Sequence, residues 1–259
     1  MNQKIAMSKI KLGEISTRAD KDFDKLKTKE KTQKIILQLN DLQNLLYAES
    51  KHSLLVVIQG MDASGKDGAI KNVFGKLNVQ GVAVKSYKEP VAEELTHDFL
   101  WRIHKAVPAK GMIQIFNRSH YEDIIITRVH KLIDDKTAKK RMKAINDFEE
   151  LLSVHNNTII LKFYLHVSFE QQQKRLAERL EDPTKMWKFN PGDSRESRLW
   201  NSYINMYEEC FANCNEIPWT IVPSDQNWYK EYIIASTVHR VLDSLNMKFP
   251  ELKDKKDEN

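Results

Sequence analysis

The sequence lacks the long apolar runs that would indicate a membrane protein. Its longest apolar runs, such as Leu54 to Ile58, are far shorter than the roughly 18 residues that a membrane-spanning helix needs. The N-terminal segment intersperses lysines among its apolar residues, so it has no uninterrupted apolar stretch of the kind found in secretory signals. We therefore expect a cytoplasmic protein with no membrane partner.

Cysteine is also scarce. Cys210 and Cys214 lie four residues apart in a helical pattern with no histidine nearby, which supports neither a disulfide framework nor a zinc site, so we expect reduced packing residues. The 41 Lys+Arg and 36 Asp+Glu nearly balance, and a net charge of +5 does not predict nucleic-acid binding. With 41% hydrophobic residues in 259, the chain can bury a substantial core, which argues against a disordered protein.

Five short apolar runs alternate with helix-length segments. This alternation is typical of a parallel sheet covered by helices on both faces, and runs as continuously apolar as the first and fourth fit strands buried on both sides. We predict a three-layer α/β fold with a five-stranded parallel sheet. The runs are Leu54–Gln59, Val82–Tyr87, Met112–Phe116, Ile159–Val167 and Trp219–Val222.

The remaining segments suggest a domain organisation. Residues 1–50 are predicted to form an N-terminal helical extension, because apolar residues between Ile35 and Leu46 recur at helical spacing. Residues 51–248 form the main domain. Within it, two prolines and one glycine between Leu180 and Ser194 interrupt helical patterns and predict a mobile lid at about residues 175–195. Residues 249–259 form a polar tail.

The strongest local motif is Gly60-Met61-Asp62-Ala63-Ser64-Gly65-Lys66, which directly follows the first predicted strand and opens a helix. Its spacing is typical of a phosphate-binding loop, in which glycines permit a tight turn, main-chain amides point inward and the lysine reaches terminal phosphates. Asp67 replaces the Ser or Thr that usually follows the lysine. The alternative is a plain glycine turn. The predicted phosphate-binding residues of this segment are Ala63, Ser64, Gly65, Lys66 and Asp67.

Asp62 lies inside this loop. A carboxylate within a loop that attracts anions is electrostatically unfavourable unless a divalent cation lies between it and the phosphates, so we predict that Asp62 is a magnesium ligand. Its alternative role is to stabilise the turn.

A second motif follows the third predicted strand. Asn117 ends that strand where related loops commonly carry an aspartate, and Arg118 and Glu122 follow at the edge of the sheet where ligands of such folds bind. Glu122 is a candidate for the missing negative ligand, or else it forms an ion pair with Arg118 or Arg128. We expect His120 to pack or to form hydrogen bonds, because phosphoryl transfer needs little proton chemistry.

Further basic residues are candidates for the substrates. Arg175 and Arg179 share one helical face of the lid and could close over a transferring phosphoryl group, although a solvated charged helix is the alternative. Lys88 and Arg102 are predicted to meet an anionic acceptor, whereas the neighbouring aromatic residues are expected to belong to the core.

Several blocks together make the sequence resemble the family-2 polyphosphate kinases. They cover most of residues 16–245 in the order found in that family. The blocks are GMDASGKDG at 60–68, YKEP at 87–90, HDFLWRIHKAVP at 97–108, IFNRSHYED at 115–123, RVH at 128–130, RLAERLEDPTKMWKF at 175–189 and PSDQNWY at 223–229.

The resemblance implies a P-loop kinase-like fold similar to that of thymidylate kinases, with a helical lid. It also implies a homo-oligomer and Mg²⁺-dependent transfer of the terminal phosphoryl group of inorganic polyphosphate to nucleotides, reversible in principle. Asp62, Lys66, Arg118 and Glu122 then match catalytic positions, Asn117 and Glu122 the acceptor motif, and Arg175 and Arg179 the lid. Asn117, together with Asp67 and Glu122, resembles the third class of the family, which phosphorylates both nucleoside monophosphates and diphosphates.

Two other functions remain compatible with these residues. An ATP-dependent kinase acting on a nucleotide or small metabolite would share the loop, the sheet and the lid. A non-catalytic nucleotide-binding regulatory module is suggested by Asp67 in place of the loop hydroxyl and by Asn117 in place of the strand-end aspartate.

Overall fold

The computed structural model describes residues 10–251, apart from the side chain of Ser194. Residues 1–9 of the predicted N-terminal extension and residues 252–259 of the predicted polar tail lie outside the described residues. None of the helices between residues 10 and 251 combines the length and the hydropathy that a membrane span requires.

A five-stranded, all-parallel sheet forms the middle layer, as the apolar runs predict. Its order is β2-β3-β1-β4-β5, with β1 in the centre, where Val56 pairs with Ile115 on one side and Leu161 on the other. Every residue of β1 is buried, whereas β2 is a largely exposed edge strand. The strands are β1 (Ser53–Gly60), β2 (Val82–Ser86), β3 (Ile113–Asn117), β4 (Thr158–His166) and β5 (Trp219–Pro223).

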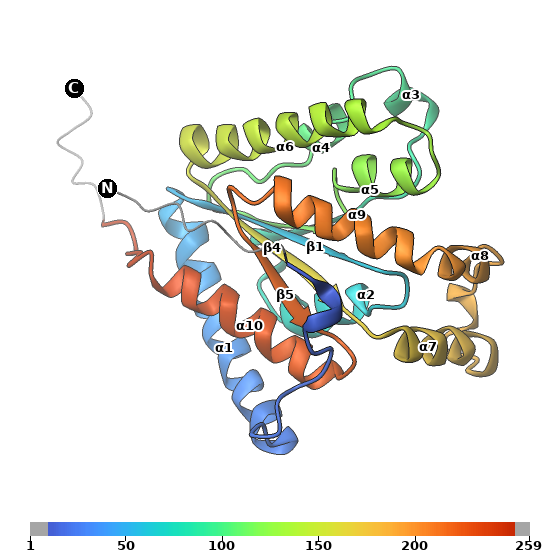
Figure 1. The fold of residues 1–259 in the computed structure, drawn as a ribbon. Coiled ribbons are helices and arrows are strands. Elements are labelled where there is room, and N and C mark those ends of the chain that lie inside the picture. The colour runs from blue at the N-terminus through green and yellow to red at the C-terminus, as the bar shows by residue number, and fades with distance from the viewer. Residues whose placement is uncertain (1–9, 252–259) are drawn as a thin grey trace.

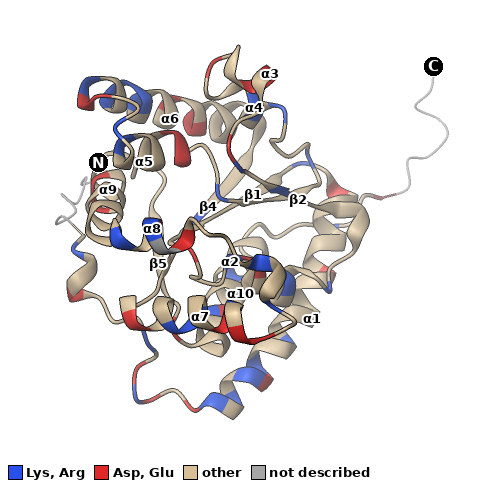
Figure 2. Ribbon diagram, turned by 90° about the vertical axis from the view of Figure 1, so that its right-hand side faces the viewer, with Lys and Arg blue, Asp and Glu red and all other residues tan. Residues whose placement is uncertain are grey.

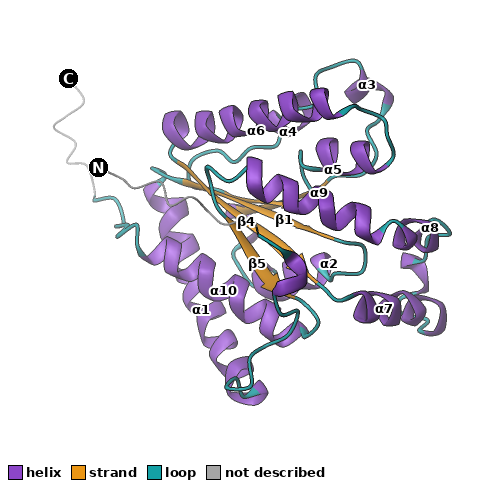
Figure 3. Ribbon diagram, in the orientation of Figure 1, coloured by secondary structure: helices purple, strands orange, loops and turns teal. Residues whose placement is uncertain are grey.

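Helices cover both faces of the sheet (Figures 1 and 3). One face carries α4 (Trp101–His104), α5 (Glu122–Val129), α6 (Asp135–Asn156) and α9 (Trp200–Asn213). The other carries α1 (Lys25–Glu49), α2 (Lys66–Phe74) and α10 (Asn227–Asp243). The short elements outside these layers are η1 (Leu12–Glu14), η2 (Val79–Gly81) and α3 (Ala92–Leu95).

The predicted lid region lies beyond the carboxyl ends of the strands (Figure 1) and is mostly helical. It contains α7 (Phe169–Glu181), the 3₁₀ turn η3 (Met186–Lys188) and α8 (Asp193–Arg198). The pattern after the lid predicts one helix from Ser194 to Asn213, but the structure divides this segment into α8 and α9 at Leu199.

Each face of the sheet has its own hydrophobic core. Leu55 and Val57 of β1 point to the core under α5, α6 and α9, whereas Leu54, Val56 and Ile58 point to the core under α1, α2 and α10. This alternation follows from the two-residue period of a strand. A central strand buried on both faces explains why the β1 segment is continuously apolar, and the five runs therefore identify a three-layer fold.

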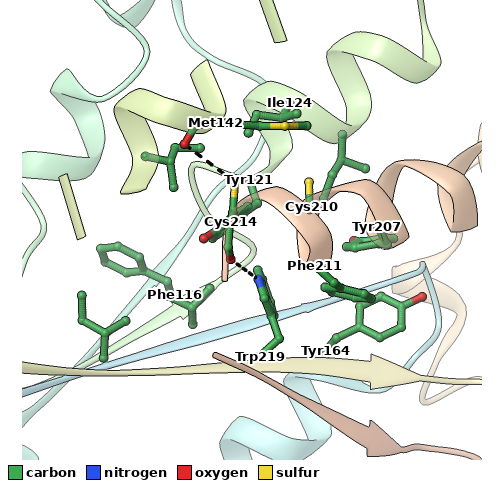
Figure 4. Packing of buried hydrophobic residues seen from close by; sticks show 14 of the residues in the cluster. Phe116, Tyr121, Ile124, Met142, Tyr164, Tyr207, Cys210, Phe211, Cys214 and Trp219 are labelled. Atoms are coloured by element: carbon green, nitrogen blue, oxygen red, sulfur yellow. Dashed lines mark hydrogen bonds between the residues drawn. The ribbon is translucent and has the colours of Figure 1, made fainter. Parts of the chain in front are cut away.

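The core under α5, α6 and α9 is rich in aromatic residues and includes both cysteines (Figure 4). Cys210 and Cys214 are free and fully buried, which confirms that they are reduced packing residues. Aromatic rings from the sheet and the helices meet there, for example Phe211 and Trp219 with centroids 5.4 Å apart.

A buried charged network lies within the same layer. Lys162 of β4 donates three hydrogen bonds from Nζ, to Glu149 Oε2 at 2.7 Å, to the Tyr121 hydroxyl at 2.8 Å and to the Cys214 carbonyl at 3.0 Å. The Tyr121 hydroxyl donates to Glu149 Oε1 at 2.8 Å, and His120 Nε2 lies 3.3 Å from the same oxygen. His120 is therefore fully enclosed in the core, where the sequence predicts packing or hydrogen bonding. We call these four side chains, Lys162, Glu149, Tyr121 and His120, the buried network.

Candidate active site

The glycine-rich loop connects β1 to α2 at the carboxyl end of the central strand. Gly60 has φ of +150° and Gly65 has φ of +94°, conformations that side chains rarely adopt. Space is restricted as well, because a Cβ on Gly60 would lie 2.8 Å from Ser64 Oγ, and one on Gly65 would lie 2.4 Å from Lys230 Nζ. Both glycines are therefore required by the turn and by its close neighbours.

Lys66 is the first residue of α2, and its side chain folds back over the loop. Nζ donates to the carbonyls of Gly60 at 2.8 Å and Met61 at 3.0 Å, and the side chain lines the cleft above the loop. Burial and the nearby positive charge of Arg118 lower the pKa of Lys66 to about 8. An anionic ligand would favour the charged form of this amine.

The cleft above the loop has a volume of about 810 Å³. Eight cationic side chains and five carboxylates line it, so its lining is positive overall. Figure 2 looks onto this end of the sheet and shows basic segments on α7 and α8. The cations are Lys66, Lys88, Arg118, Arg175, Arg179, Lys185, Lys188 and Lys230, and the carboxylates are Asp62, Asp67, Glu89, Glu178 and Asp193.

Arg118 links the loop to the start of α5. Its Nη2 donates to Asp62 Oδ1 at 2.6 Å, and its Nη1 lies 3.7 Å from Glu122 Oε2. Arg118 has a left-handed backbone, with φ of 62°, and its amide donates to the Ile58 carbonyl, which turns the residue toward the loop. The structure thus brings Asp62, Arg118 and Glu122 together at the edge where the sequence places them. The ion pair of Glu122 with Arg118 is one of the two roles that the sequence suggests for Glu122.

The two acidic groups differ in environment. Burial raises the pKa of Asp62, but the positive charges of Arg118, Lys66 and Arg179 outweigh it and hold the pKa below its usual value. For Glu122 burial dominates over the attraction of Arg118 and Lys66, and its pKa is raised. Asp62 lines the cleft, whereas Glu122 does not. Asp62 is therefore the better-placed anionic group for a ligand in the cleft.

The carboxylates of the cleft fit a magnesium ion that also binds substrate. Within residues 10–251 no group of three or more His, Cys, Asp or Glu is arranged to hold a metal by itself. Mg²⁺ in phosphoryl-transfer sites typically takes only one or two carboxylates and completes its shell with phosphate oxygens and water. Asp62 and Asp67, which both face the cleft, meet this requirement.

Asp67 contacts both the second motif and the lid. Its Oδ1 accepts from Asn117 Nδ2 at 2.9 Å, and its Oδ2 accepts from Lys188 Nζ at 2.9 Å. Burial raises the pKa of Asp67, but the bonds from Lys188 and Asn117 outweigh it and lower the pKa. The residue in the place of the usual loop hydroxyl therefore joins the loop, β3 and the lid.

The two lid arginines differ in what they contact. Arg175 donates to the loop carbonyls of Ala63 at 2.9 Å and Ser64 at 3.0 Å, and also to the carbonyls of Ser224 and Asp225. Arg175 therefore holds the loop against the end of β5 while it lines the cleft. Arg179 forms an ion pair with Asp193 of α8 at 2.6 Å and also lines the cleft.

Of the two predicted acceptor cations, only Lys88 lines the cleft. Arg102 is buried, lies 3.3 Å from both Glu94 and Asp123, and donates to the Lys88 carbonyl at 3.0 Å. Its donors are directed to protein acceptors, so Arg102 supports the segment that carries Lys88.

Lys230 is a site residue that sequence reasoning missed. It lies in the first turn of α10, and its Nζ donates to the Gly65 carbonyl at 3.1 Å and to Asn227 Oδ1 at 2.9 Å. Burial and the charge of Arg175 lower its pKa to about 7. Its position in the sequence could have identified Lys230. The first helical turn after the fifth parallel strand must lie at the same edge of the sheet as the glycine-rich loop.

Comparison with known proteins gives consistent matches over nearly the whole chain. The family model described as polyphosphate kinase 2 (PPK2) matches residues 22–251. An AMP/ADP-polyphosphate phosphotransferase from Meiothermus ruber is 44% identical over 216 residues, which cover 83% of this chain and 80% of that protein. An ADP-polyphosphate phosphotransferase from Rhodopseudomonas palustris is 38% identical over 94% of this chain and 89% of its own length.

A solved structure agrees with these sequence matches. The crystal structure of a polyphosphate kinase 2 from Arthrobacter aurescens superposes with a TM-score of 0.92 at 36% identity. The superposition covers 96% of this chain and 90% of that one. The similarity thus includes the sheet, both helical layers and the lid.

Proposed function

The chain belongs to the polyphosphate kinase 2 family, and from this premise we propose that it transfers the terminal phosphoryl group of inorganic polyphosphate to AMP and ADP. The names of its relatives from Meiothermus ruber and Rhodopseudomonas palustris support a nucleotide acceptor, and the former names both AMP and ADP. Together with Asn117, Asp67 and Glu122, this similarity favours the class that accepts monophosphates as well as diphosphates.

The observation that carries this proposal is the convergence of cationic side chains on the glycine-rich loop. The donor and the acceptor are both polyanions that repel each other, so a catalyst must neutralise both in one enclosed place. A cleft lined by eight cations and five carboxylates, with Lys66 at its base, suits this task.

The reaction moves one phosphoryl group, and the side chains of the cleft stabilise its charge. An oxygen of the acceptor phosphate attacks the terminal phosphorus of the polyphosphate, the bridging P–O bond breaks, and the chain leaves one unit shorter. The attacking oxygen is already ionised near neutral pH, so no strong base is needed. Phosphate charge is stabilised at the glycine-rich loop by the loop amides, Lys66 and Lys230. Arg118, which follows β3, and Arg179 of the lid add further positive charge.

Asp62 and Asp67 would hold Mg²⁺ on the phosphates. When bound, the ion supplies positive charge that offsets the charge developing on the transferred group. Asp62 pairs with Arg118, and both side chains line the cleft, so both are within reach of phosphates bound there. Lys88 and Asn117 remain the proposed acceptor contacts, with Arg102 holding the backbone of Lys88 and Glu122 paired with Arg118.

The decisive experiment is incubation of the purified protein with Mg²⁺, polyphosphate and either AMP or ADP, followed by separation of the nucleotides. We expect ADP and ATP to form from AMP, and ATP from ADP. A parallel reaction with ATP as donor tests the ordinary kinase alternative, which predicts transfer from ATP and none from polyphosphate. A regulatory module would bind nucleotide and form no product with either donor.

We further propose that the protein acts in the cytoplasm as a homo-oligomer that regenerates nucleoside triphosphates. Light scattering of the purified chain after gel filtration measures the assembly directly. A molar mass close to the 30.3 kDa of one chain would contradict the oligomer.

A further inference from the structure

A second hollow lies outside the cleft, between the N-terminal half of α1, the second half of α2 and the start of α10. Its volume is about 790 Å³, close to that of the cleft itself. Lys25 and Lys29 of α1 lie one helical turn apart on the face that lines it. Lys71 of α2 and Lys76, just after that helix, line the opposite wall. We call this hollow the lysine groove.

The lysine groove has a net positive charge. All four lysines are exposed, and none forms an ion pair with any residue between 10 and 251. Within that range Glu231 is the one carboxylate of its lining, and Glu231 accepts a hydrogen bond from Asn72 at 2.6 Å. Figure 2 shows basic segments on α1. Four like charges around one hollow repel one another unless an anion occupies it.

The groove meets the cleft at Asn227. This residue lines both hollows, and on the cleft side its Oδ1 accepts from Lys230 Nζ at 2.9 Å and Arg175 Nη2 at 3.4 Å. Because α2 begins at Lys66 in the phosphate loop and carries Lys71 further along, basic residues follow the helix from the loop to the groove. A linear anion bound at the loop can therefore continue over Asn227 into the groove.

We propose that the lysine groove binds the distal part of the polyphosphate chain, beyond the phosphates held in the cleft. This inference rests on the proposed function, because it assigns to the groove the same donor that reacts at the loop. A chain of evenly spaced negative charges suits exposed lysines, which act as mobile point charges and require no fixed geometry. Short donors end before they reach the groove, so the groove affects only long ones.

The test uses full-length protein in which Lys25, Lys29, Lys71 and Lys76 are all replaced by Gln. A matched control replaces four exposed lysines away from the groove, Lys110, Lys136, Lys139 and Lys140, by Gln, so that net charge falls equally. For wild type and both variants, kcat and KM are measured with long-chain polyphosphate and with tripolyphosphate as donor, at several salt concentrations.

The groove variant should have a KM for long-chain polyphosphate raised about tenfold or more at low salt, with KM for tripolyphosphate and kcat within about twofold of wild type. For the long donor, the slope of log KM against log salt concentration should decrease by roughly 2 to 3. This estimate assumes about 0.7 for each lysine that neutralises a phosphate. The control variant should behave as wild type.

The outcomes are distinguishable. Equal losses with both donors, or equal losses in the control variant, would mean that net charge and not the groove matters. An unchanged KM of the groove variant for the long donor would overturn the inference. This holds even if that variant binds a single-stranded oligonucleotide less tightly. Absence of transfer from either donor by wild type would refute the proposed function itself.

Discussion

Lys66 and Lys230 are the residues whose charge state responds most to the contents of the cleft. Both amines are buried, and each has its pKa lowered by that burial and by a neighbouring arginine, to about 8 and about 7 respectively. In the free protein near neutral pH, part of the positive charge expected at the loop is therefore absent. Binding of a polyanion restores it, so binding takes up protons.

The KM for polyphosphate should consequently depend on pH. The ligand binds the protonated amines, so affinity is highest below about pH 7 and falls as pH rises through the two pKa values. We expect KM to rise between about pH 6.5 and about pH 9, by up to about tenfold per pH unit for each lysine above its pKa. Lys230→Met should remove the step near pH 7 and raise KM at low pH. A profile of KM that is flat in wild type would contradict this assignment.

Replacement of Lys66 should abolish most of the activity without unfolding the protein. Lys66→Met removes the charge nearest the transferred group, and we expect kcat to fall by about 10³-fold or more. Circular dichroism and thermal unfolding should match wild type closely, because the substitution removes a desolvated charge as well as two hydrogen bonds. Lys85→Met on the exposed edge strand is the matched control and should retain activity.

Glu122 is expected to affect the choice of acceptor. It orients Arg118 from outside the cleft, and AMP has a single phosphate whose position depends on that arginine, whereas ADP offers a second phosphate for other cations. Glu122→Ala should lower kcat/KM for AMP about tenfold more than for ADP. Equal losses with the two acceptors would show that Glu122 has no such role.

At this scale the sequence identifies residues that lie in recognisable motifs and misses those that do not. Asp62, Lys66 and Arg118 were proposed because the loop and strand-end motifs have fixed positions in such folds, and all three line the cleft. Lys230 was missed because its helix has an ordinary amphipathic pattern that gives no sign of which side chain bends toward the loop. Arg102 is predicted from the sequence as an acceptor contact, and the sequence does not reveal that two carboxylates lie 3.3 Å from it.

Among the elements, the lid is joined to the body of the protein by contacts that include Arg175 with the glycine-rich loop and Lys188 with Asp67. Asp67 and Lys188 form one of them, between partly exposed side chains, and such pairs contribute about 0.2–1 kcal/mol. The neighbouring Trp187 is 76% exposed and Phe189 is 48% exposed, so chymotrypsin can reach this segment.

Asp67→Asn should therefore make the lid open more often. We expect chymotrypsin to cleave after Trp187 up to about fivefold faster than in wild type, as follows from the loss of one exposed pair. Asp147→Asn breaks a comparable exposed pair with Lys143 on α6 and should leave this cleavage rate unchanged. If both substitutions accelerate cleavage equally, the contact does not hold the lid.

The sequence located the lid through its two prolines and glycine but did not give its internal structure. Turn residues mark where a regular helix stops, and they do not determine the short 3₁₀ turn and the helix that follow. The break at Leu199 between α8 and α9 has no Pro or Gly, so hydrophobic periodicity alone predicts one continuous helix there.

For the whole molecule, the fold was accessible because its central strands are buried on both faces and are therefore continuously apolar. The order of the strands could not be predicted in the same way. It depends on how the crossover connections pack on the sheet, and hydrophobic periodicity carries no information about that. The buried network was likewise not predicted: Lys162 interrupts an apolar strand, and nothing nearby in the sequence identifies Glu149 as its partner.

Loss of either charge in the buried network should destabilise the protein. Glu149→Gln leaves the Lys162 ammonium in the core without its counter-charge, and we expect the free energy of unfolding to fall by about 3–5 kcal/mol. The double variant Lys162→Met with Glu149→Leu should lose less than the sum of the two single losses. Urea denaturation measures these differences. Additive losses would show that the two groups are energetically independent.

The contact between Gly65 and Lys230 has a consequence for synthesis of the chain. The glycine-rich loop leaves the ribosome early, but the amine that touches its Gly65 carbonyl and the Asp225 carbonyl that positions Arg175 are translated more than 150 residues later. A nascent chain thus displays the complete nucleotide-kinase motif long before it has the groups that shape it. We therefore expect catalysis to require the last helix, and chains truncated before it should transfer no phosphoryl group from polyphosphate.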